Sequence, residues 1–317
     1  MTSDLESDPM EPSPNEANRL PIQSDDAPRL PFSSLAVRGF AAGNRAILGA
    51  LLLFLLLAPN QIGGNLSAVL LLETGGMQVQ PGKEPPPEAF MMIGVGCFIC
   101  TWLPLVVFGM PWVMGGILGI VRGAVIGDPV DKFPSNAKRY YVRLLLLVLL
   151  AIVASLAIYL PITLAGSLIS GQQQVDMAAG FTPERLQESS RNPVNLAFGY
   201  VAMMAFAGVG VILNLTQASI ALENAELMTA IGKAFRFCQR HVADTCKLYV
   251  IAAIISFPTV FLQQAMAMFG LFTYGSALGL AVLFSAYLSY SSVINSGIGV
   301  SLYHGRVADN KCELPAS

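Results

Sequence analysis

The sequence predicts an all-helical integral membrane protein, a bundle of six transmembrane helices. Three observations predict this class: long apolar segments, a deficit of charge within them, and an uneven placement of basic residues between them. Of the 317 residues, 54% are hydrophobic and only 12% are charged. In soluble domains about a quarter of the residues are charged. The charged residues gather between the apolar segments, which is typical of a chain solvated by lipid.

Six apolar segments are each long enough to cross a bilayer, whose hydrocarbon core of about 30 Å takes about 20 helical residues. They cover residues 46–66, 90–121, 144–164, 196–220, 248–268 and 278–302. The first segment contains Pro59, Gly63 and Gly64, so we expect it to kink or unwind near its outer end. The second is longer than one straight crossing needs and contains Pro104 and Pro111, which predicts a tilted or kinked helix.

The basic residues alternate in abundance from one connecting segment to the next. With the N-terminus in the cytoplasm, Lys83, Arg185 and Arg191 fall in outer segments, and the other 15 of the 18 basic residues fall in inner ones. Cytoplasmic segments of membrane proteins are enriched in Lys and Arg. The split therefore predicts an even number of spans, with both termini in the cytoplasm.

Three parts of different composition divide the chain. Residues 1–30 are acidic and rich in proline, and such a segment cannot bury enough apolar surface to order itself. We expect a disordered cytoplasmic tail there, more simply a solubilising terminus than a recruitment tail. The membrane domain is predicted over residues 31–306, and residues 307–317 are predicted to form a short cytoplasmic tail.

A basic, aromatic and amphipathic stretch precedes every odd-numbered span, at residues 32–45, 134–143 and 230–240. Helices of this kind lie in the membrane interface with their cations toward the headgroups. The cations expected to contact lipid headgroups are Arg139, Arg143, Arg236 and Arg240. The chain would then consist of three repeats, each of an interfacial helix and two spans. The alternative is that basic loops beside apolar helices look amphipathic without any repeat.

Short motifs within this arrangement support a resemblance to a known family. They are Gly115-Gly116 with Arg122, then Ala234-Phe235-Arg236, and the closing Leu302-Tyr303-His304-Gly305-Arg306. On these residues the chain resembles poorly characterised bacterial six-span membrane proteins, which are related to the membrane domain of glycerophosphodiester phosphodiesterases. The resemblance covers roughly residues 32–306. It implies the six-span fold and a bacterial inner (plasma) membrane, and it implies no known activity.

Small residues recur every four positions at Gly115, Gly119 and Gly123. On a helix they form one smooth stripe that lets another helix approach closely. The stripe predicts a tight helix–helix contact, either between two spans of this chain or between two copies of it. We favour the contact within the chain, because small residues line most packed membrane interfaces.

The last three apolar segments carry polar side chains that are disfavoured against lipid and need partners. The candidates for a polar cavity are Asn214, Gln217, Gln263 and Asn295. Hydrogen bonds between helices are the simpler explanation. No ionisable residue accompanies these side chains at membrane depth, which argues against an ion-coupled pump.

No motif in the sequence predicts catalysis, a metal or a cofactor. Cys238, His241 and Asp244 are spaced by three residues, but a closed zinc site needs four ligands, and a surface helix explains them better. We therefore expect a non-enzymatic scaffold or interaction subunit, whose partners are membrane lipids and another membrane protein or a second copy, without nucleic acid. The alternative is a transporter or lipid-handling protein with a polar cavity between spans four to six. A membrane-embedded enzyme has the least support.

Overall fold

The computed structural model describes residues 30–73, 87–128, 132–169, 193–269 and 274–311, and every element in these ranges is an α-helix. The elements are α1 (Phe32–Arg45), α2 (Ile47–Glu73), α3 (Pro87–Ile126), α4 (Phe133–Ile169), α6 (Pro193–Glu223), α7 (Leu227–Arg240), α8 (Val242–Phe269) and α9 (Tyr274–Lys311). The predicted disordered tail and the predicted outer segments that hold Lys83, Arg185 and Arg191 lie outside the described residues. The last helix continues beyond residue 306, where the membrane domain was predicted to end.

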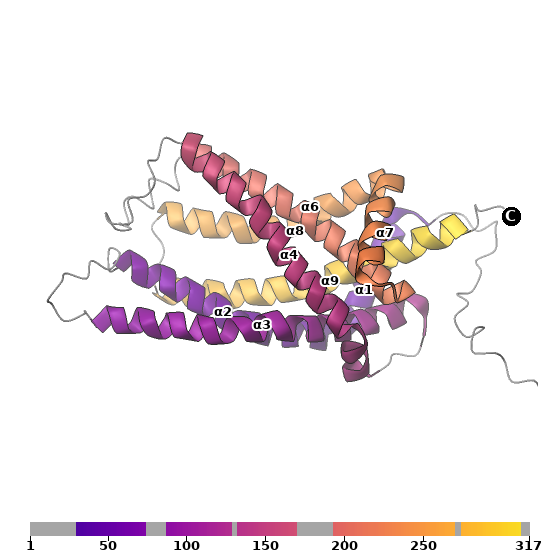
Figure 1. Ribbon diagram of the computed structural model, residues 1–317, viewed down its shortest axis with the longest axis horizontal. Coiled ribbons are helices and arrows are strands. Elements are labelled where there is room, and N and C mark those ends of the chain that lie inside the picture. Colours follow the sequence, from indigo (N-terminus) through magenta and orange to yellow (C-terminus); the bar gives the residue numbers. More distant parts are fainter. Residues whose placement is uncertain (1–29, 74–86, 129–131, 170–192, 270–273, 312–317) are drawn as a thin grey trace, which may run out of the picture.

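Six long helices, α2, α3, α4, α6, α8 and α9, run along the length of the molecule (Figure 1). Each of them contains one of the six predicted apolar segments, except that Ala46, the first residue of the first segment, lies between α1 and α2. Four helical stretches are long and apolar enough to cross a membrane, namely Trp102–Ile126, Phe133–Gly166, Ala197–Glu223 and Leu278–Val307. The bent pair of α1 and α2 raises the number to five if it is one span. The described chain is therefore all-helical with four to five candidate membrane-spanning helices.

The first apolar segment is broken at its start, whereas the sequence predicted a kink or unwinding near its outer end. Between α1 and α2 the helix axis turns by 68°, and the amide of Ala46 closes α1 by donating to the carbonyl of Gly43 at 2.8 Å. Around Pro59 the backbone stays helical. Helices tolerate proline in an apolar setting because neighbouring groups satisfy the freed carbonyl, whereas unwinding would expose several backbone groups.

The long helices form an inner group and an outer group. The inner helices α3, α6 and α9 contact one another. Each outer helix packs between two inner ones: α2 between α9 and α3, α4 between α3 and α6, and α8 between α6 and α9. This cyclic order follows the chain, because each outer helix directly precedes one of the two inner helices that it contacts.

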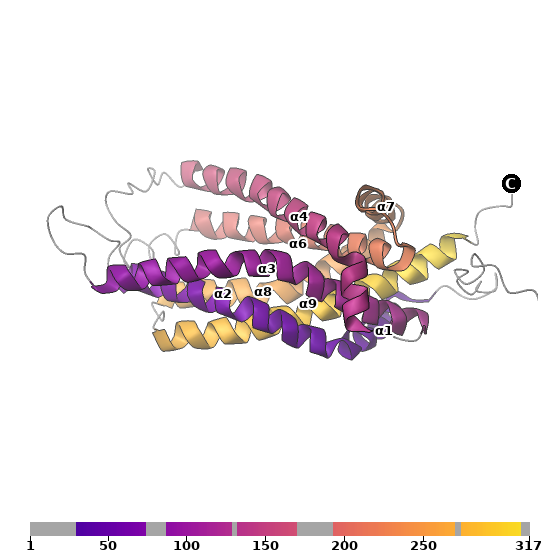
Figure 2. The same ribbon diagram turned by 60° about the horizontal axis from the view of Figure 1, so that its bottom comes forward.

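One end of the bundle is closed by short helices that run across it. The helices α1 and α7 lie at this end, and Figure 2 shows α7 almost end-on while the long helices run across the view. The second predicted interfacial stretch is no separate helix, because α4 is continuous from Phe133. Its first turns nevertheless bend away from the line of the rest of α4 (Figures 1 and 2).

The core is densest near this closed end. Side chains from every packed element are buried there, among them Leu35, Ile117, Tyr140, Leu215, Leu248 and Leu302. Farther along α4, large apolar side chains face outward, including Leu146, Leu150, Val153, Leu156 and Leu164. An apolar surface of this extent is foreign to a soluble monomer and is solvated in a bilayer, which agrees with the membrane assignment.

Candidate functional site

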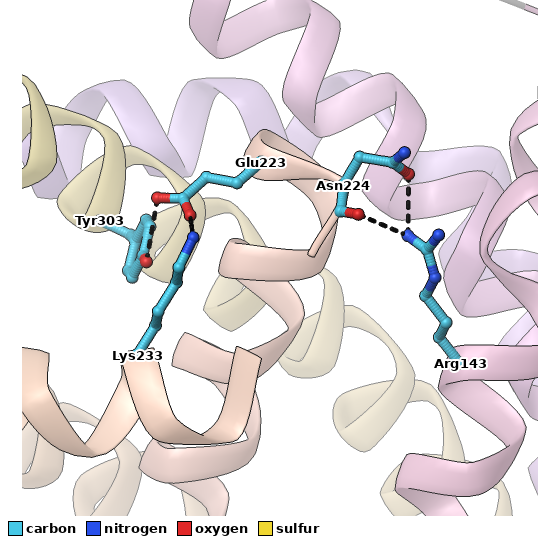
Figure 3. A network of polar contacts seen from close by, with 5 residues as sticks. All are labelled: Arg143, Glu223, Asn224, Lys233 and Tyr303. Carbon is cyan, nitrogen blue, oxygen red and sulfur yellow. Dashed lines mark hydrogen bonds and ion pairs between the residues drawn. The ribbon is translucent and has the colours of Figure 1, made fainter. Parts of the chain in front are cut away.

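A network of polar contacts joins three helices at the closed end (Figure 3). The Glu223 carboxylate, at the end of α6, pairs with the ammonium group of Lys233 on α7. The hydroxyl of Tyr303 on α9 donates to the other carboxylate oxygen at 3.2 Å. The Tyr303 ring also stacks on Phe237 of α7, with centroids 5.4 Å apart. Glu223 therefore holds α7 against both α6 and α9.

The neighbouring residue ties the end of α6 to α4. One guanidinium nitrogen of Arg143 donates to the carbonyl oxygen of Asn224 at 3.0 Å and to its side-chain oxygen at 2.8 Å (Figure 3). Asn224 has a φ of 52°, a left-handed conformation that asparagine tolerates better than most residues. The chain can thus leave α6 sharply and turn back into α7, while the hydroxyl of Tyr140 caps the carbonyl of Ala221 at 3.3 Å.

Similar contacts tie the other helices of the closed end. A guanidinium nitrogen of Arg38 on α1 donates to the carbonyl of Val125 in the last turn of α3. Arg306 on α9 donates to the Asp244 carboxylate on α8 at 2.7 Å and to the carbonyl of Leu30 at 3.1 Å. Four of the basic side chains on this side, Arg38, Arg143, Lys233 and Arg306, therefore join helices.

The four arginines predicted to contact lipid headgroups have different surroundings. Arg139, Arg236 and Arg240 are exposed. Arg143 is only partly exposed, and its contact with Asn224 places it in the helix-joining network instead. The structure therefore groups three of the four on the outer surface and separates Arg143 from them.

The predicted glycine stripe faces the start of α4. A Cβ atom added at Gly115 would lie 3.0 Å from the carbonyl oxygen of Ala137, and one at Gly119 would overlap the side chain of Asn136. Gly123 is buried farther along the same helix. The contact that Gly115 and Gly119 make lies within the chain and brings the first turns of α4 onto α3.

The predicted polar cavity is only partly assembled. The amide nitrogen of Asn214 on α6 donates to the backbone carbonyl of Asn295 on α9 at 2.7 Å. The side-chain oxygens of both asparagines are buried and find no hydrogen-bond partner among the described residues. Gln217 is half-buried one turn away on α6, and the side chain of Gln263 lies outside the described part of the structure.

Five hydroxyl groups of α6 and α9 bond their own backbone, whereas the buried hydroxyls of Ser219 and Ser301 find no partner among the described residues. The donor–acceptor pairs are Thr216 to Ile212, Ser285 to Ala281, Ser289 to Ser285, Ser291 to Leu288, and Ser296 to Ser292, over 2.6–3.1 Å. A hydroxyl that donates to a carbonyl three or four residues earlier is satisfied without a ligand. The serine-rich face of α9 is therefore compatible with close packing.

The spaced Cys238, His241 and Asp244 do not converge on one point. Asp244 binds Arg306, and the His241 ring packs on Phe237. Burial raises the pKa of the Cys238 thiol, which keeps it neutral and a poor metal ligand. Within the described ranges, no three His, Cys, Asp or Glu side chains are grouped closely enough to hold a metal ion.

The sequence did not predict the network around Glu223. The residue was visible only as a carboxylate near the inner edge of the fourth span, with Lys233 ten positions later in a basic stretch. Comparison of the chain with protein families, with curated proteins and with solved structures found no match.

Proposed function

We propose that this protein is a six-span, non-enzymatic membrane scaffold with both termini in the cytoplasm of a bacterial cell. The six long helices, each containing one apolar segment, support the number of spans. The basic side chains of the closed end support the orientation, because the positive side of a membrane protein faces the cytoplasm. The inner-membrane location and the relation to the phosphodiesterase membrane domain rest on the short motifs of the sequence.

The cyclic packing supports the proposed threefold repeat. In each unit the interfacial segment packs on the last helix of another unit: α1 on α9, the start of α4 on α3, and α7 on α6. In the first two units, an arginine of this segment also donates to a carbonyl at the end of its own unit's last helix, Arg38 to Val125 and Arg143 to Asn224. Repeats of this kind are common in membrane folds.

The observation that carries the scaffold proposal is the internal use of polar groups. Several hydroxyl groups of α6 and α9 bond to their own helices, and Arg38, Glu223 and Arg306 join helices at the closed end. The helices are therefore joined to one another at the closed end, and no other helix of the described chain covers the long apolar face of α4. Such an arrangement is suited to holding another membrane protein or a second copy.

Purification in mild detergent after crosslinking in the membrane tests the scaffold. We expect a reproducible crosslinked partner or dimer, and enrichment of crosslinks at cysteines placed on the outward face of α4, such as Leu150→Cys and Leu156→Cys. Buried positions of the same helix, such as Leu147→Cys, are the matched control. A strict monomer without any reproducible partner contradicts the scaffold.

A lipid-handling protein or transporter is the second candidate, and the unpaired side-chain oxygens of Asn214 and Asn295 favour it. Buried acceptors need a donor, which a bound polar molecule would supply. The purification that tests the scaffold also tests this candidate. A small molecule or lipid that copurifies with the wild-type protein and is lost from Asn214→Leu supports it, and identical bound material in both proteins contradicts it.

The proposed topology predicts from which side of the membrane an impermeant reagent reaches a given cysteine. Cys246 is exposed near the start of α8. In a variant that keeps only this cysteine, we expect a membrane-impermeant maleimide to label inverted vesicles and to spare spheroplasts. Ser189→Cys in a cysteine-free background, in the predicted outer segment, should show the reverse pattern. Labelling of both positions from the same side would rule out the proposed orientation.

A further inference from the structure

Three segments surround the closed end of the bundle, and we call them the collar: α1, the first turns of α4 (residues 133–143), and α7. Each rests on an inner helix through small or short side chains. In α1 the buried contacts include Gly39 and Ala42, and in α7 they include Ala230 and Ala234. The opposite faces of these segments point away from the bundle.

The outward faces of the collar combine apolar side chains with cations. The exposed apolar residues are Val37 and Phe40 on α1, Val142 on α4, and Met228 and Phe235 on α7. The exposed cations beside them are Arg45 on α1, Lys138 and Arg139 on α4, and Arg236 and Arg240 on α7. The same two kinds of residue therefore recur at three places around one end.

The helix α7 shows the arrangement most clearly because it has three faces. Residues seven apart share one side of a helix, so Met228 and Phe235 form an outward apolar face, on which Met228 is 77% exposed. Arg236 and Arg240, four residues apart, lie beside it. The third face, with Ala230, Ala234 and Phe237, is buried against the bundle.

The basic residues of α7 fall into a paired group and an outward-facing group. The one lysine of the helix is paired with Glu223, whereas Arg236 and Arg240 face outward. The exposed acidic residue nearest to α7 in the sequence, Glu226, precedes the helix and lies ten residues from Arg236. The outward surface of α7 is therefore positive along its second half, next to exposed apolar rings and chains.

We propose that the collar binds anionic phospholipids of the surrounding leaflet, with Arg236 and Arg240 contacting the lipid phosphates and Phe235 entering the acyl boundary. A helix that lies across the ends of membrane spans, with apolar residues on one outward face and arginines beside it, matches the interface between headgroups and acyl chains. An acidic protein would match the arginines alone and would leave Met228 and Phe235 in water. The proposal rests on the membrane placement proposed above but not on the scaffold role.

Native mass spectrometry of the full-length protein in detergent tests the proposal. Phosphatidylglycerol and phosphatidylcholine of equal chain length are titrated, and the retained lipids are counted. We expect the wild-type protein to prefer phosphatidylglycerol. Each arginine near an anionic lipid surface contributes roughly fivefold to binding, so Arg236→Gln with Arg240→Gln should reduce the preference by roughly 25-fold.

Matched controls separate the site from net charge and from folding. The variant Arg185→Gln with Arg191→Gln removes the same charge from the predicted outer segment and should keep the preference. Unfolding midpoints of all variants are compared, and because both α7 arginines are exposed, we expect the double variant to unfold like the wild-type protein. Phe235→Ser should weaken retention of both lipids, which reports the apolar contact separately.

Other outcomes contradict the proposal. Equal retention of both lipids by the wild-type protein, or an unchanged preference in the Arg236 and Arg240 variant, would overturn it. Displacement of phosphatidylglycerol by inorganic phosphate at equal concentration would show an anion site without lipid recognition and would also overturn it. If crosslinking finds a protein that is lost in this variant while lipid preference stays unchanged, α7 is a protein-docking helix. The scaffold role is judged by the crosslinking and not by lipid retention.

Discussion

Replacing Gly297 with alanine is expected to destabilise the protein by about 3 kcal/mol, the upper end of the usual cost of overpacking. A Cβ atom at this position of α9 would overlap the carbonyl oxygen of Gly39 on α1 and lie 3.0 Å from the amide nitrogen of Gly43. Both obstacles are backbone atoms, so no side-chain rotation can relieve them. The helix α1 would have to move away from α9 and would leave Leu35, now buried, without its packing.

The unfolding midpoint of the purified protein in detergent measures this effect, and amide hydrogen exchange across residues 32–45 shows where it acts. Gly210→Ala on α6 is the matched control, because nothing lies within 4 Å of a Cβ atom added there. We expect the control to be as stable as the wild-type protein or more stable by up to about 1 kcal/mol, because alanine favours the helix over glycine. If Gly297→Ala unfolds like Gly210→Ala, α1 does not rest on α9 as described.

The positions of the long helices could be predicted from the sequence because hydropathy varies along the chain in the same way that lipid exposure does. Their packing order could not. The approach of Gly39 to Gly297 joins two helices at opposite ends of the sequence. Gly39 and Gly43 are four residues apart, and Gly297, Ser301 and Gly305 recur at the same spacing, but such spacing does not identify the partner helix. Gly115 and Gly119 also form a stripe, so a close contact was predictable, but nothing in the spacing indicated α4 as the partner.

The roles of the basic residues were predictable as a group and not one by one. Their alternation between segments predicted the positive end, since it depends only on position along the chain. Arg139 and Arg143 look alike in the sequence, yet Arg139 is exposed and Arg143 binds Asn224. The difference arises from the sharp turn after α6, which brings the carbonyl of Asn224 to α4 from 81 residues away.

Reversing the charge of Glu223 is expected to have the second large effect, because this side chain joins three helices. In Glu223→Lys the carboxylate that pairs with Lys233 is replaced by a like charge, and the Tyr303 hydroxyl loses its acceptor. Hydrogen bonds to charged groups contribute about 1.5–3 kcal/mol. Lys233 is partly exposed, and solvent screening reduces the repulsion. We therefore expect a loss of about 2 kcal/mol, concentrated on α7.

Amide hydrogen exchange over residues 227–240 measures this effect directly, because α7 should exchange faster once its anchor is lost while the interiors of the long helices stay protected. Tyr303→Phe is the matched control. It removes the hydroxyl that bonds Glu223 and keeps the ring that stacks on Phe237, so it should cost about 1.5 kcal/mol, less than Glu223→Lys.

The charge-swapped double variant, Glu223→Lys with Lys233→Glu, separates the ion pair from other effects at these positions. The pair is restored with opposite polarity, whereas a lysine at position 223 cannot accept the hydrogen bond from Tyr303. The hydrogen-exchange protection of α7 should therefore recover only in part. We expect it to reach about the protection that α7 has in Tyr303→Phe, which keeps the ion pair and lacks the same hydrogen bond. If the double variant is no more protected than Glu223→Lys alone, the pair does not hold α7, and packing of Phe237 against Tyr303 must be what keeps the helix in place.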